Sequence, residues 1–565
     1  MYSGNNMFGN SNYKGEIKKR TWTIMVILML LFCLLIWRIS NYMYFKAEPL
    51  KAMFNAQYTI DEKYGMSYKL LDCDGKILLN YEKEYTAVID PVDYFRFNEY
   101  TSKYDMEVLT ITLRNYNADY DLDKIEGNGS FEKVRYKIDE ITFNKLKDIK
   151  GVKGFYAYEA NEVINDRYWK IENVLSNPKY NKKDELYPVF KDDDSLEMQI
   201  YNKTKNNESE KIRFDKEVNG EISEGRIIYP ENNVNVRLTL DKEIQEKIES
   251  ILHEEKYTQI GVVLMESANG KIRAMAQKND MLYNANLRIA YPGSIFKTIV
   301  SEAGLDLNII DKNEMFTVDG KSFEKLDKHG NGYKYTHGGA YYDSSNDIYA
   351  QIGTRVGLEN IYDYAKKQGL LNRVLNLYLE NNVDVDLSTM NGNISQSAIG
   401  QTDRITPLQA INIPNTVINK GIYVQPSIIE AYVNDTNEIL EEVNYKTSRV
   451  LKSETAESMK YFMMDVVTKG TGQQAYIEGM NIGGKTGTTE YYDNGKKHSD
   501  GWFVGFFNLN GKNYSMVVFV PDIDINIAGK DDEEGGTTAA PIFKEIVEVL
   551  KTVKITNKKI IKPIK

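Results

Sequence analysis

The hydrophobic residues of this 565-residue chain follow three different patterns. Residues 21–37, TWTIMVILMLLFCLLIW, form an apolar run without a charged residue. Residues 39–235 are polar, rich in charge and tyrosine, and contain no long apolar run. From about residue 234 onward, apolar residues alternate or recur at helical spacing, which predicts strands and helices around a core. The patterns therefore predict three regions of different character.

The apolar run is expected to cross a membrane, because its length is at the lower limit for spanning a bilayer. Lys14, Lys18, Lys19 and Arg20 precede it, and such a basic cluster marks the cytoplasmic side. A buried core helix is the alternative, but it would have a polar face, and this run has none. No cleavage site follows closely, so we expect an uncleaved signal anchor at 21–38 and a cytoplasmic tail at 1–20. The rest of the chain is then outside the cell membrane.

Residues 39–235 predict an elongated, β-rich pedestal domain without visible chemistry. EVLTITL (107–113) predicts a strand, and FNKLKDIKGV (143–152) predicts a short helix. The polar stretches 205–211 and 230–233 predict surface loops.

The region from 236 to 553 predicts strand hairpins at both of its ends. Asn269-Gly270 lies between two apolar runs near the start, and Asn510-Gly511 does so near the end. Asp241 is expected to cap a helix that follows a strand at 234–240. We expect the two ends to meet in one antiparallel sheet flanked by helices, with the middle forming a helical subdomain. This is an α+β fold.

The chain is expected to close with an amphipathic helix at 541–553, which starts at Pro541. A basic tail follows it at 554–565.

The stretch GMNIGGKT, residues 479–486, permits two interpretations. It satisfies the P-loop pattern, and it also begins the tripeptide Lys485-Thr486-Gly487 of serine acyl-enzymes. A P-loop follows a buried strand and opens a helix at its Lys-Thr pair. Here a predicted helix precedes the stretch, and turn formers and β-branched residues follow it. We therefore interpret the P-loop match as coincidental.

Two companion motifs favour the acyl-enzyme. Ser294-Ile-Phe-Lys297 is an S-x-x-K motif, and Ser344-Ser345-Asn346 is an S-x-N motif further along the chain. Each motif alone is weak evidence, because short patterns arise by chance. All three in this order, each in suitable local structure, predict a serine acyl-enzyme site.

The residue types fit nucleophilic catalysis. A serine hydroxyl is a poor nucleophile until a base removes its proton. A turn at Pro292-Gly293 can start a helix at Ser294, which brings Lys297 onto the same face one turn later. Burial and a second cation, Lys485, are expected to lower the pKa of Lys297 so that it acts as the base.

The remaining motif residues are expected to handle the substrate. Ser344 can relay a proton to the leaving amine, and Asn346 can hold Lys297 and a substrate amide. Thr486, Gly487 and Thr488 are expected on an edge strand, where the hydroxyls and Lys485 offer partners to a substrate carboxylate. The backbone N–H groups of Ser294 and Thr488 are expected to form the oxyanion hole.

No cofactor or metal is expected. His337 and His498 are placed to line the cleft, but no third ligand stands at a standard spacing, which favours polar loop residues.

These motifs resemble those of the penicillin-binding proteins, specifically the class B, monofunctional transpeptidases. The resemblance covers roughly residues 236–550, and the segments 236–249, 397–410, 466–475 and 498–507 are also similar to family elements. Residues 69–81, KLLDCDGKILLNY, depart from the family's Arg-Gly-led motif there, which leaves pedestal contacts open.

The resemblance implies a membrane-anchored enzyme that cross-links peptidoglycan. Ser294 would be acylated by D-Ala-D-Ala stem peptides, with possible carboxypeptidase side activity, and by β-lactam antibiotics as substrate mimics. The implied partners are a polytopic SEDS-family glycosyltransferase and other elongation or division proteins. A net charge of −10 argues against nucleic acid. Two alternatives stay open, namely a membrane-bound β-lactamase or penicillin sensor, and a non-catalytic scaffold of the cell-wall machinery.

Overall fold

The computed structural model describes residues 10–44, 57–63, 66–99, 101–127, 132–164, 170–183, 185–217, 219–278, 284–323, 328–380, 393–493, 496–523 and 534–552. The chain divides into two compact units. Unit 1 is formed by segments 1–65, 82–162 and 209–230, and unit 2 by segments 66–81, 163–208 and 231–565. The predicted basic tail, 554–565, lies outside the described residues.

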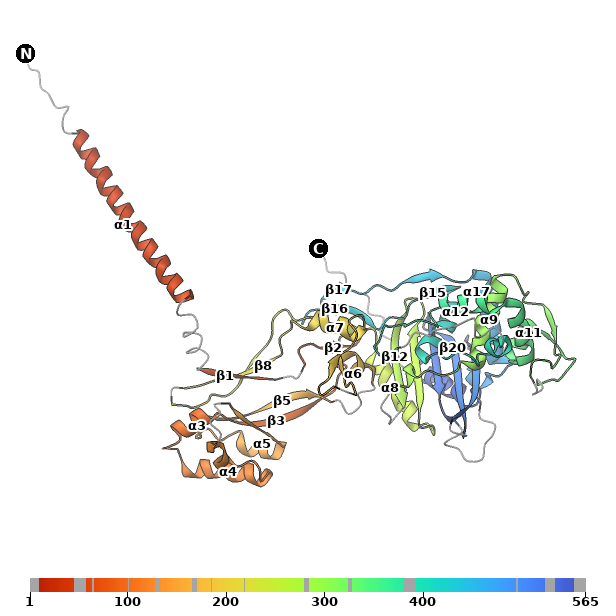
Figure 1. The fold of residues 1–565 in the computed structure, drawn as a ribbon, viewed down its shortest axis with the longest axis horizontal. Helices are drawn as coiled ribbons and strands as arrows, with labels where there is room; N and C mark the ends of the chain where they lie inside the picture. The colour runs from red at the N-terminus through yellow and green to blue at the C-terminus, as the bar shows by residue number, and fades with distance from the viewer. Residues whose placement is uncertain are drawn as a thin grey trace, which may run out of the picture. The chain divides into compact units, whose positions relative to one another are not determined.

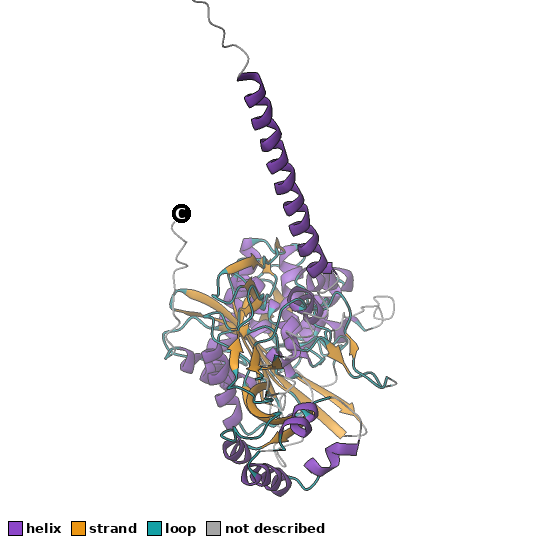
Figure 2. Ribbon diagram, turned by 90° about the vertical axis from the view of Figure 1, so that its left-hand side faces the viewer, coloured by secondary structure: helices purple, strands orange, loops and turns teal. Residues whose placement is uncertain are grey.

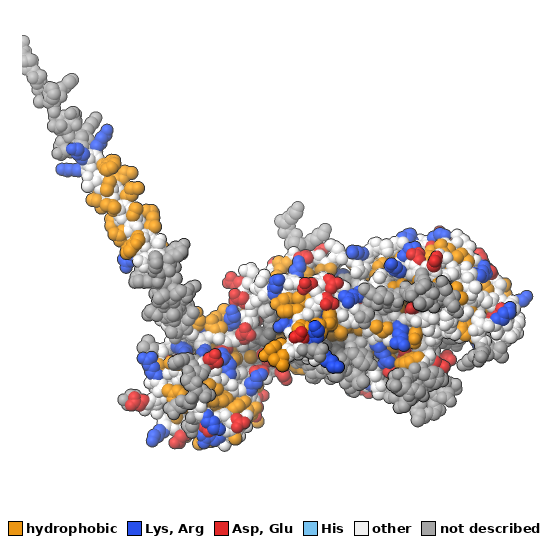
Figure 3. All heavy atoms as spheres, in the orientation of Figure 1, with side chains coloured by type: hydrophobic (Ala, Val, Ile, Leu, Met, Phe, Trp, Pro, Cys, Tyr) orange, Lys and Arg blue, Asp and Glu red, His pale blue; other side chains and the backbone are white. Residues whose placement is uncertain are grey.

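The first element is the uninterrupted helix α1, Asn10–Tyr44 (Figure 2). Its stretch Lys18–Asn41 is long and apolar enough to cross a membrane. Hydrophobic side chains surround this part of the helix, with basic side chains at its N-terminal end (Figure 3). The helix fits a membrane anchor or a signal sequence, and the uncleaved anchor expected from the apolar run stays a prediction.

Unit 1 contains two small sheets. The first has the strand order β4-β3-β5, with β3 at Tyr81–Ile89, β4 at Val134–Ile138 and β5 at Phe155–Val163. The second has the order β1-β8-β9, with β1 at Tyr58–Glu62, β8 at Lys211–Asp215 and β9 at Arg226–Ile228. Besides α1, the helices in the described part of this unit are α3 (Pro91–Phe97), α4 (Lys103–Tyr116), α5 (Glu140–Leu146) and the 3-10 helix η1 (Leu122–Gly127).

The strand predicted at 107–113 is wrong, because these residues lie inside helix α4. Leu109 and Leu113, four residues apart, enter the core with β3 and β4, whereas Ile111 between them is 55% exposed. The β-branched residues of EVLTITL favoured a strand, but burial at helical spacing decides the structure. The helix predicted at 143–152 begins earlier, where Asp139 caps α5, and it ends at Leu146.

The centre of unit 2 is a five-stranded antiparallel sheet with the order β12-β11-β21-β20-β19. Its strands β12 and β20 are labelled in Figure 1. Strands β11 (Ile260–Glu266) and β12 (Lys271–Lys278) form the first predicted hairpin. Strands β20 (Lys496–Leu509) and β21 (Lys512–Val520) form the second, and β19 (Gly483–Asp493) is the edge strand beside β20. The pairing of β11 with β21 joins the two ends of the region, as predicted.

Both faces of this sheet are buried. Val262 and Leu264 enter one core with α8 (Lys242–Glu254) and α18 (Ala539–Leu550). Val263 and Met265, which alternate with them, enter the opposite core with the helical subdomain. Successive strand residues point to opposite faces, so a doubly covered sheet explains the continuous apolar runs in these strands.

The helical subdomain lies between the two hairpins in sequence. Its main helices are α9 (Lys297–Asp306), α10 (His337–Tyr342), α11 (Asn346–Val356), α12 (Leu358–Lys367), α16 (Asn412–Ile418) and α17 (Ser453–Thr468). Shorter helical pieces are η2 (Ala285–Leu287), η3 (Gly293–Phe296), α14 (Ile394–Ala398), α15 (Pro407–Ala410) and η4 (Gln473–Ala475). Its short strands are β13 (Met315–Thr317), β14 (Lys334–Thr336), β15 (Ile422–Val424) and β18 (Thr447–Arg449).

Unit 2 also includes segments from the region that the sequence assigns to the pedestal. Strand β2, Leu70–Leu71, pairs in parallel with β10, Asn235–Leu238, and the buried carboxylate of Asp72 accepts a hydrogen bond from the Lys242 backbone N–H. The sheet that contains them has the order β17-β16-β10-β2. The other elements are α6 (Ile171–Ser176), α7 (Leu196–Thr204), β6 (Lys179–Tyr180), β7 (Val189–Phe190), β16 (Ile429–Val433) and β17 (Ile439–Glu442).

Alanine substitutions in α4 test its conformation. Leu109→Ala and Leu113→Ala are each expected to lower the free energy of unfolding by about 2–5 kcal/mol, because each removes a buried leucine side chain. Ile111→Ala is expected to change it by no more than about 0.5 kcal/mol, as is usual for exposed positions. Denaturant unfolding of the three variants measures this. A strand would place all three residues on one face, so equal losses would contradict the helix.

Candidate active site

The S-x-x-K motif begins in a tight turn against the edge strand. Gly293 has a φ of 56°, and a Cβ there would lie 2.8 Å from the Thr488 carbonyl oxygen, so only glycine fits without strain. The Gly293 N–H donates to the Gly400 carbonyl at 3.0 Å, and the Trp502 indole N–H donates to the Tyr291 carbonyl at 3.0 Å. Three segments therefore fix the backbone on which Ser294 stands.

Ser294 lies in η3, and Lys297 opens α9 three residues later. The Lys297 side chain is fully buried. Its Nζ donates to the Ser344 carbonyl at 2.7 Å, to Ser344 Oγ at 3.2 Å and to Asn346 Oδ1 at 2.6 Å. The structure therefore brings Lys297 together with both predicted polar residues of the S-x-N motif.

The loop between α10 and α11 presents Ser344 in an uncommon conformation. Its φ is 60°, a left-handed value that is costly for a residue with a side chain. The next residue, Ser345, caps α11 by accepting a hydrogen bond from the Ile348 N–H at 3.2 Å. This cap fixes the loop next to Ser344, whose hydroxyl and carbonyl oxygens accept hydrogen bonds from Lys297.

Lys485 of β19 reaches the same hydroxyl from the other side. Its Nζ donates to Ser344 Oγ at 2.9 Å and to the Thr486 carbonyl at 3.0 Å, and its side chain is also fully buried. Burial lowers the pKa of Lys485 to about 7, against the opposing field of the Glu534 carboxylate. Since Lys297 and Lys485 both contact one oxygen, the two amines are at most about 6 Å apart, where like charges disfavour one another.

The threonines of β19 hold defined contacts. Thr486 Oγ1 and Thr471 Oγ1 share a hydrogen bond of 2.6 Å, and Thr488 Oγ1 accepts one from the Gly535 N–H at 3.0 Å. A Cβ on Gly535 would lie 2.2 Å from the Gly487 carbonyl oxygen, so its segment lies directly against the strand. The sequence predicted no role for Thr471 or Gly535, although Thr471 lies in segment 466–475, which is similar to a family element.

The two histidines lie in different surroundings. His337 is fully buried rather than in a cleft, its Nε2 is 3.0 Å from Ser301 Oγ, and burial lowers its pKa to about 4. His498 stacks on Tyr491 and its Nδ1 is 3.3 Å from Asp522 Oδ1. In the described part of the chain, no group of three or more His, Cys, Asp or Glu side chains is arranged to hold a metal ion.

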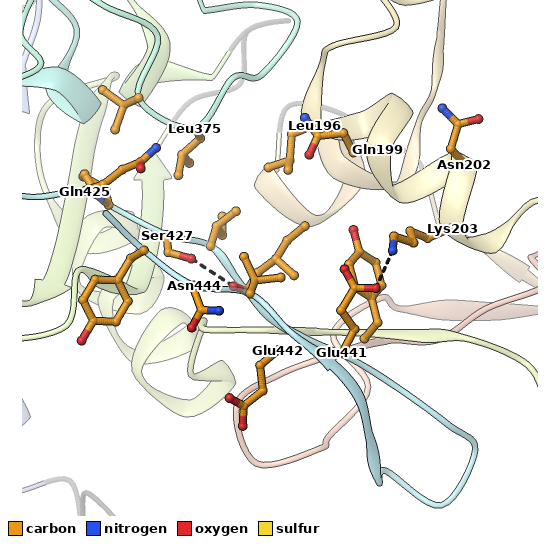
Figure 4. Close-up of a pocket in the computed structure, with 17 residues that line it drawn as sticks. Leu196, Gln199, Asn202, Lys203, Leu375, Gln425, Ser427, Glu441, Glu442 and Asn444 are labelled. Carbon is orange, nitrogen blue, oxygen red and sulfur yellow. Dashed lines mark hydrogen bonds and ion pairs between the residues drawn. The ribbon is translucent and has the colours of Figure 1, made fainter. Parts of the chain in front are cut away.

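A cavity of about 610 Å³ lies elsewhere in unit 2, between α7 and the β16–β17 region (Figure 4). Leu196, Lys203, Gln425 and Glu441 are among its lining residues, and Lys203 forms an ion pair with Glu441. The lining contains none of the predicted catalytic residues. We therefore base the candidate site on the lysine–serine geometry and not on the cavity.

The fold and the three motifs together define a serine acyl-enzyme class. The family model described as the penicillin-binding protein transpeptidase domain matches residues 260–548. The chain belongs to this family, and its resemblance to the class B members is confirmed.

Two curated relatives illustrate the extent of the similarity. Stage V sporulation protein D of Bacillus subtilis is 28% identical over 349 residues, which cover 56% of this chain and 53% of that protein. Penicillin-binding protein PbpB of Mycolicibacterium smegmatis is 26% identical over 351 residues, which cover 56% of this chain and 54% of that protein. The chain thus spans about half the length of these relatives.

The solved structures extend the likeness of fold to most of the chain. A peptidoglycan synthetase from Bifidobacterium adolescentis has a TM-score of 0.60 at 19% identity, covering 88% of this chain and 96% of that one. Penicillin-binding protein 3 from Mycobacterium tuberculosis, complexed with aztreonam, has a TM-score of 0.57 at 19% identity, covering 87% of this chain and 97% of that one. The likeness includes the N-terminal β-rich region.

The depressed pKa of Lys485 makes stability depend on pH. Between pH 7 and 10.5 the unfolded chain holds a proton that the native Lys485 has lost, so stability rises with pH in this window. Relative to Lys485→Met, the wild type is expected to gain up to about 1.4 kcal/mol of unfolding free energy per pH unit.

Denaturant titrations of both proteins at several pH values measure this difference. Lys334→Met, which removes a charge from an exposed position, controls for the loss of one surface cation. A wild-type-minus-Lys485→Met difference that stays flat above pH 7 would contradict the depressed pKa.

Proposed function

We propose that the protein is a membrane-anchored peptidoglycan DD-transpeptidase that cross-links D-Ala-D-Ala stem peptides through an acyl-enzyme on Ser294. The observation that carries the proposal is the convergence of Lys297 and Lys485 on Ser344 Oγ, at 3.2 and 2.9 Å, beside the turn that holds Ser294. In the proposal, Lys297 is the base, Ser344 the proton relay and Lys485 the cation for the nucleophile Ser294.

In the proposed acylation, neutral Lys297 takes the proton of the Ser294 hydroxyl, and Oγ attacks the carbonyl carbon of the penultimate D-Ala. The developing oxyanion is bound by the backbone N–H groups of Ser294 and Thr488. The C–N bond breaks, the terminal D-Ala leaves as an amine that receives a proton through Ser344, and the acyl group stays on Ser294. An acceptor amine then attacks the ester, loses its proton to the site, and restores the serine.

The hydrogen bonds of Ser344 support its role as the relay. A hydroxyl has two acceptor lone pairs and one donor proton. Lys297 and Lys485 both donate to Ser344 Oγ, so the hydroxyl proton is left to point away from both amines. A leaving amine is an acceptor that such a proton can reach.

The substrate carboxylate is proposed to bind along β19. Cationic Lys485 attracts it, and the Thr488 hydroxyl, which accepts from the Gly535 N–H, keeps its own proton for donation. Thr486 would contribute through the hydrogen bond that it shares with Thr471. β-Lactams carry a carboxylate and a reactive amide, so they would occupy the same positions and acylate Ser294.

The location and partners form part of the proposal. Helix α1 would be an uncleaved anchor with residues 1–20 in the cytoplasm and the catalytic region outside, because basic residues stand at its N-terminal end. The class B resemblance supports a SEDS-family glycosyltransferase and other elongation or division proteins as partners.

Penicillin labelling tests the acyl-enzyme. The full-length protein in detergent is expected to gain the mass of one benzylpenicillin and to keep it for hours, whereas Ser294→Ala gains none. Intact-mass spectrometry over time measures both. Ser345→Ala, which changes a neighbouring serine that caps α11, controls for general damage to the site region and is expected to be labelled. Penicillin left intact with no adduct would exclude catalysis and favour a scaffold, and rapid penicillin loss without an adduct would mean a β-lactamase.

The N-terminus of the protein isolated from membranes tests the anchor. An uncleaved anchor predicts that residues ahead of α1's apolar stretch are still present, which N-terminal peptide mapping measures. A chain that begins after residue 38 and is released from the membrane would show a cleaved signal sequence instead.

A further inference from the structure

Two tyrosines lie beneath the two lysines of the candidate site. Tyr341 is in α10 and Tyr349 is in α11, on either side of the S-x-N loop, and both side chains are fully buried. The Lys297 Nζ lies 5.4 Å from the centroid of the Tyr349 ring, and the Lys485 Nζ lies 5.7 Å from that of Tyr341. Both distances are within the range of cation–π attraction.

The hydroxyl groups of these tyrosines are tied to α9. Tyr349 Oη is 2.5 Å from Ser301 Oγ, and Tyr341 Oη is 2.8 Å from Thr298 Oγ1. Ser301 and Thr298 stand on the helix that Lys297 opens. Since each hydroxyl is engaged there, the ring faces are what the tyrosines offer to the lysines.

Ring faces suit this position for a physical reason. A buried ammonium loses its hydration, which favours the neutral amine. A carboxylate placed beside it would hold the proton firmly, whereas an aromatic face attracts the cation by a smaller amount. A smaller attraction leaves the proposed base, Lys297, able to change its protonation state near neutral pH. The same attraction favours the ammonium form that the proposed carboxylate-binding cation, Lys485, requires.

We propose that Tyr341 and Tyr349 are positioning residues, each of which holds one of the two site lysines over its ring face and thereby helps to decide which lysine carries the proton. Tyr349 serves Lys297, and Tyr341 serves Lys485. This inference rests on the proposed function, because its consequence is measured in the acylation of Ser294.

Other titratable groups face the same region and enter the design of the test. Glu302 of α9 is fully buried, and burial raises its pKa to about 8, so its carboxyl group is neutral at pH 7. When it is ionised, its charge raises the pKa of Tyr341. Glu534 acts on Lys485 from an exposed position, and neutral His337 contacts Ser301. The two lysines also act on each other across Ser344.

The expected result is a separate shift of each limb in the pH profile of acylation. The acidic limb reports the loss of the proton from Lys297, and the basic limb its loss from Lys485. Removing a ring face weakens the ammonium form, so Tyr349→Leu is expected to move the acidic limb down by about one pH unit. Tyr341→Leu is expected to move the basic limb down by a similar amount and to leave the acidic limb in place.

The measurement is the second-order rate constant of benzylpenicillin acylation of the full-length protein in detergent, from pH 5 to pH 10. Tyr349→Phe and Tyr341→Phe keep the ring and are expected to keep both limbs at the wild-type pH. Tyr514→Leu removes another buried tyrosine, which lies in β21 and packs on Phe507 of β20, and is expected to shift neither limb. Because Glu302 titrates within this pH range, the Tyr341→Leu and Tyr341→Phe variants are also measured in a Glu302→Gln background.

Pentafluorophenylalanine in place of Tyr349 covers the case in which the leucine variant does not fold. It keeps the shape of the ring but reverses the charge distribution of its face, so its acidic limb is expected below that of Tyr349→Phe. Equal limbs for these two ring variants, or a rate loss in the leucine variants without any limb shift, would overturn the inference while acylation itself persists. A wild-type protein that is not acylated at any pH would instead overturn the proposed function, and this inference with it.

Discussion

Two buried amines that share the oxygen of Ser344 set the main constraint on unit 2. Lys297 reaches this oxygen from α9, and Lys485 reaches it from β19. Two ammonium groups so close together, and both out of water, disfavour each other, so the surroundings must supply compensating contacts. These are the Ser344 and Thr486 carbonyls, the Asn346 amide and two aromatic rings. The left-handed backbone of Ser344 is the conformational cost of presenting both its hydroxyl and its carbonyl.

Backbone contacts with no chemistry of their own make this arrangement possible. Glycines at 293, 400 and 535 let three separate segments approach the nucleophile turn and the edge strand more closely than any side chain would permit. The indole of Trp502 ties the neighbouring strand to the same turn. The precision of the site therefore depends on close main-chain approach, which is a property of the whole sheet and its covering helices.

Much of the fold of unit 2 was predictable because its sequence signals are local. The Asn-Gly turns marked both hairpins, and Asp241 marked the start of α8. The meeting of Lys297, Ser344, Asn346 and Lys485 was expected from the chemistry that the three motifs require, and it is seen in the geometry. The edge position of β19 was also expected, and it is confirmed.

The failures have a common physical origin in long-range packing. The residues of α4 carry β-branched side chains that favour a strand, and only the core they meet decides otherwise. Tyr341 and Tyr349 looked like ordinary aromatic residues, since nothing in their spacing shows what lies over their rings. The division of the chain into units was likewise hidden, because the pairing of Leu70–Leu71 with β10 joins residues that are far apart in sequence.

The order of segments along the chain has a consequence for biogenesis. Segments 82–162 and 209–230 of unit 1 are complete in sequence well before the strand β21 of unit 2 has been made. The central sheet cannot close until β21 pairs with β11, some 250 residues earlier, and contacts of such separation form slowly. If the chain leaves the ribosome and crosses the membrane N-terminus first, unit 1 can fold while β11 and β12 still lack their neighbour. The candidate site, which needs Lys485 of β19, is then assembled last, so an incomplete chain would lack part of the proposed acyl-enzyme site.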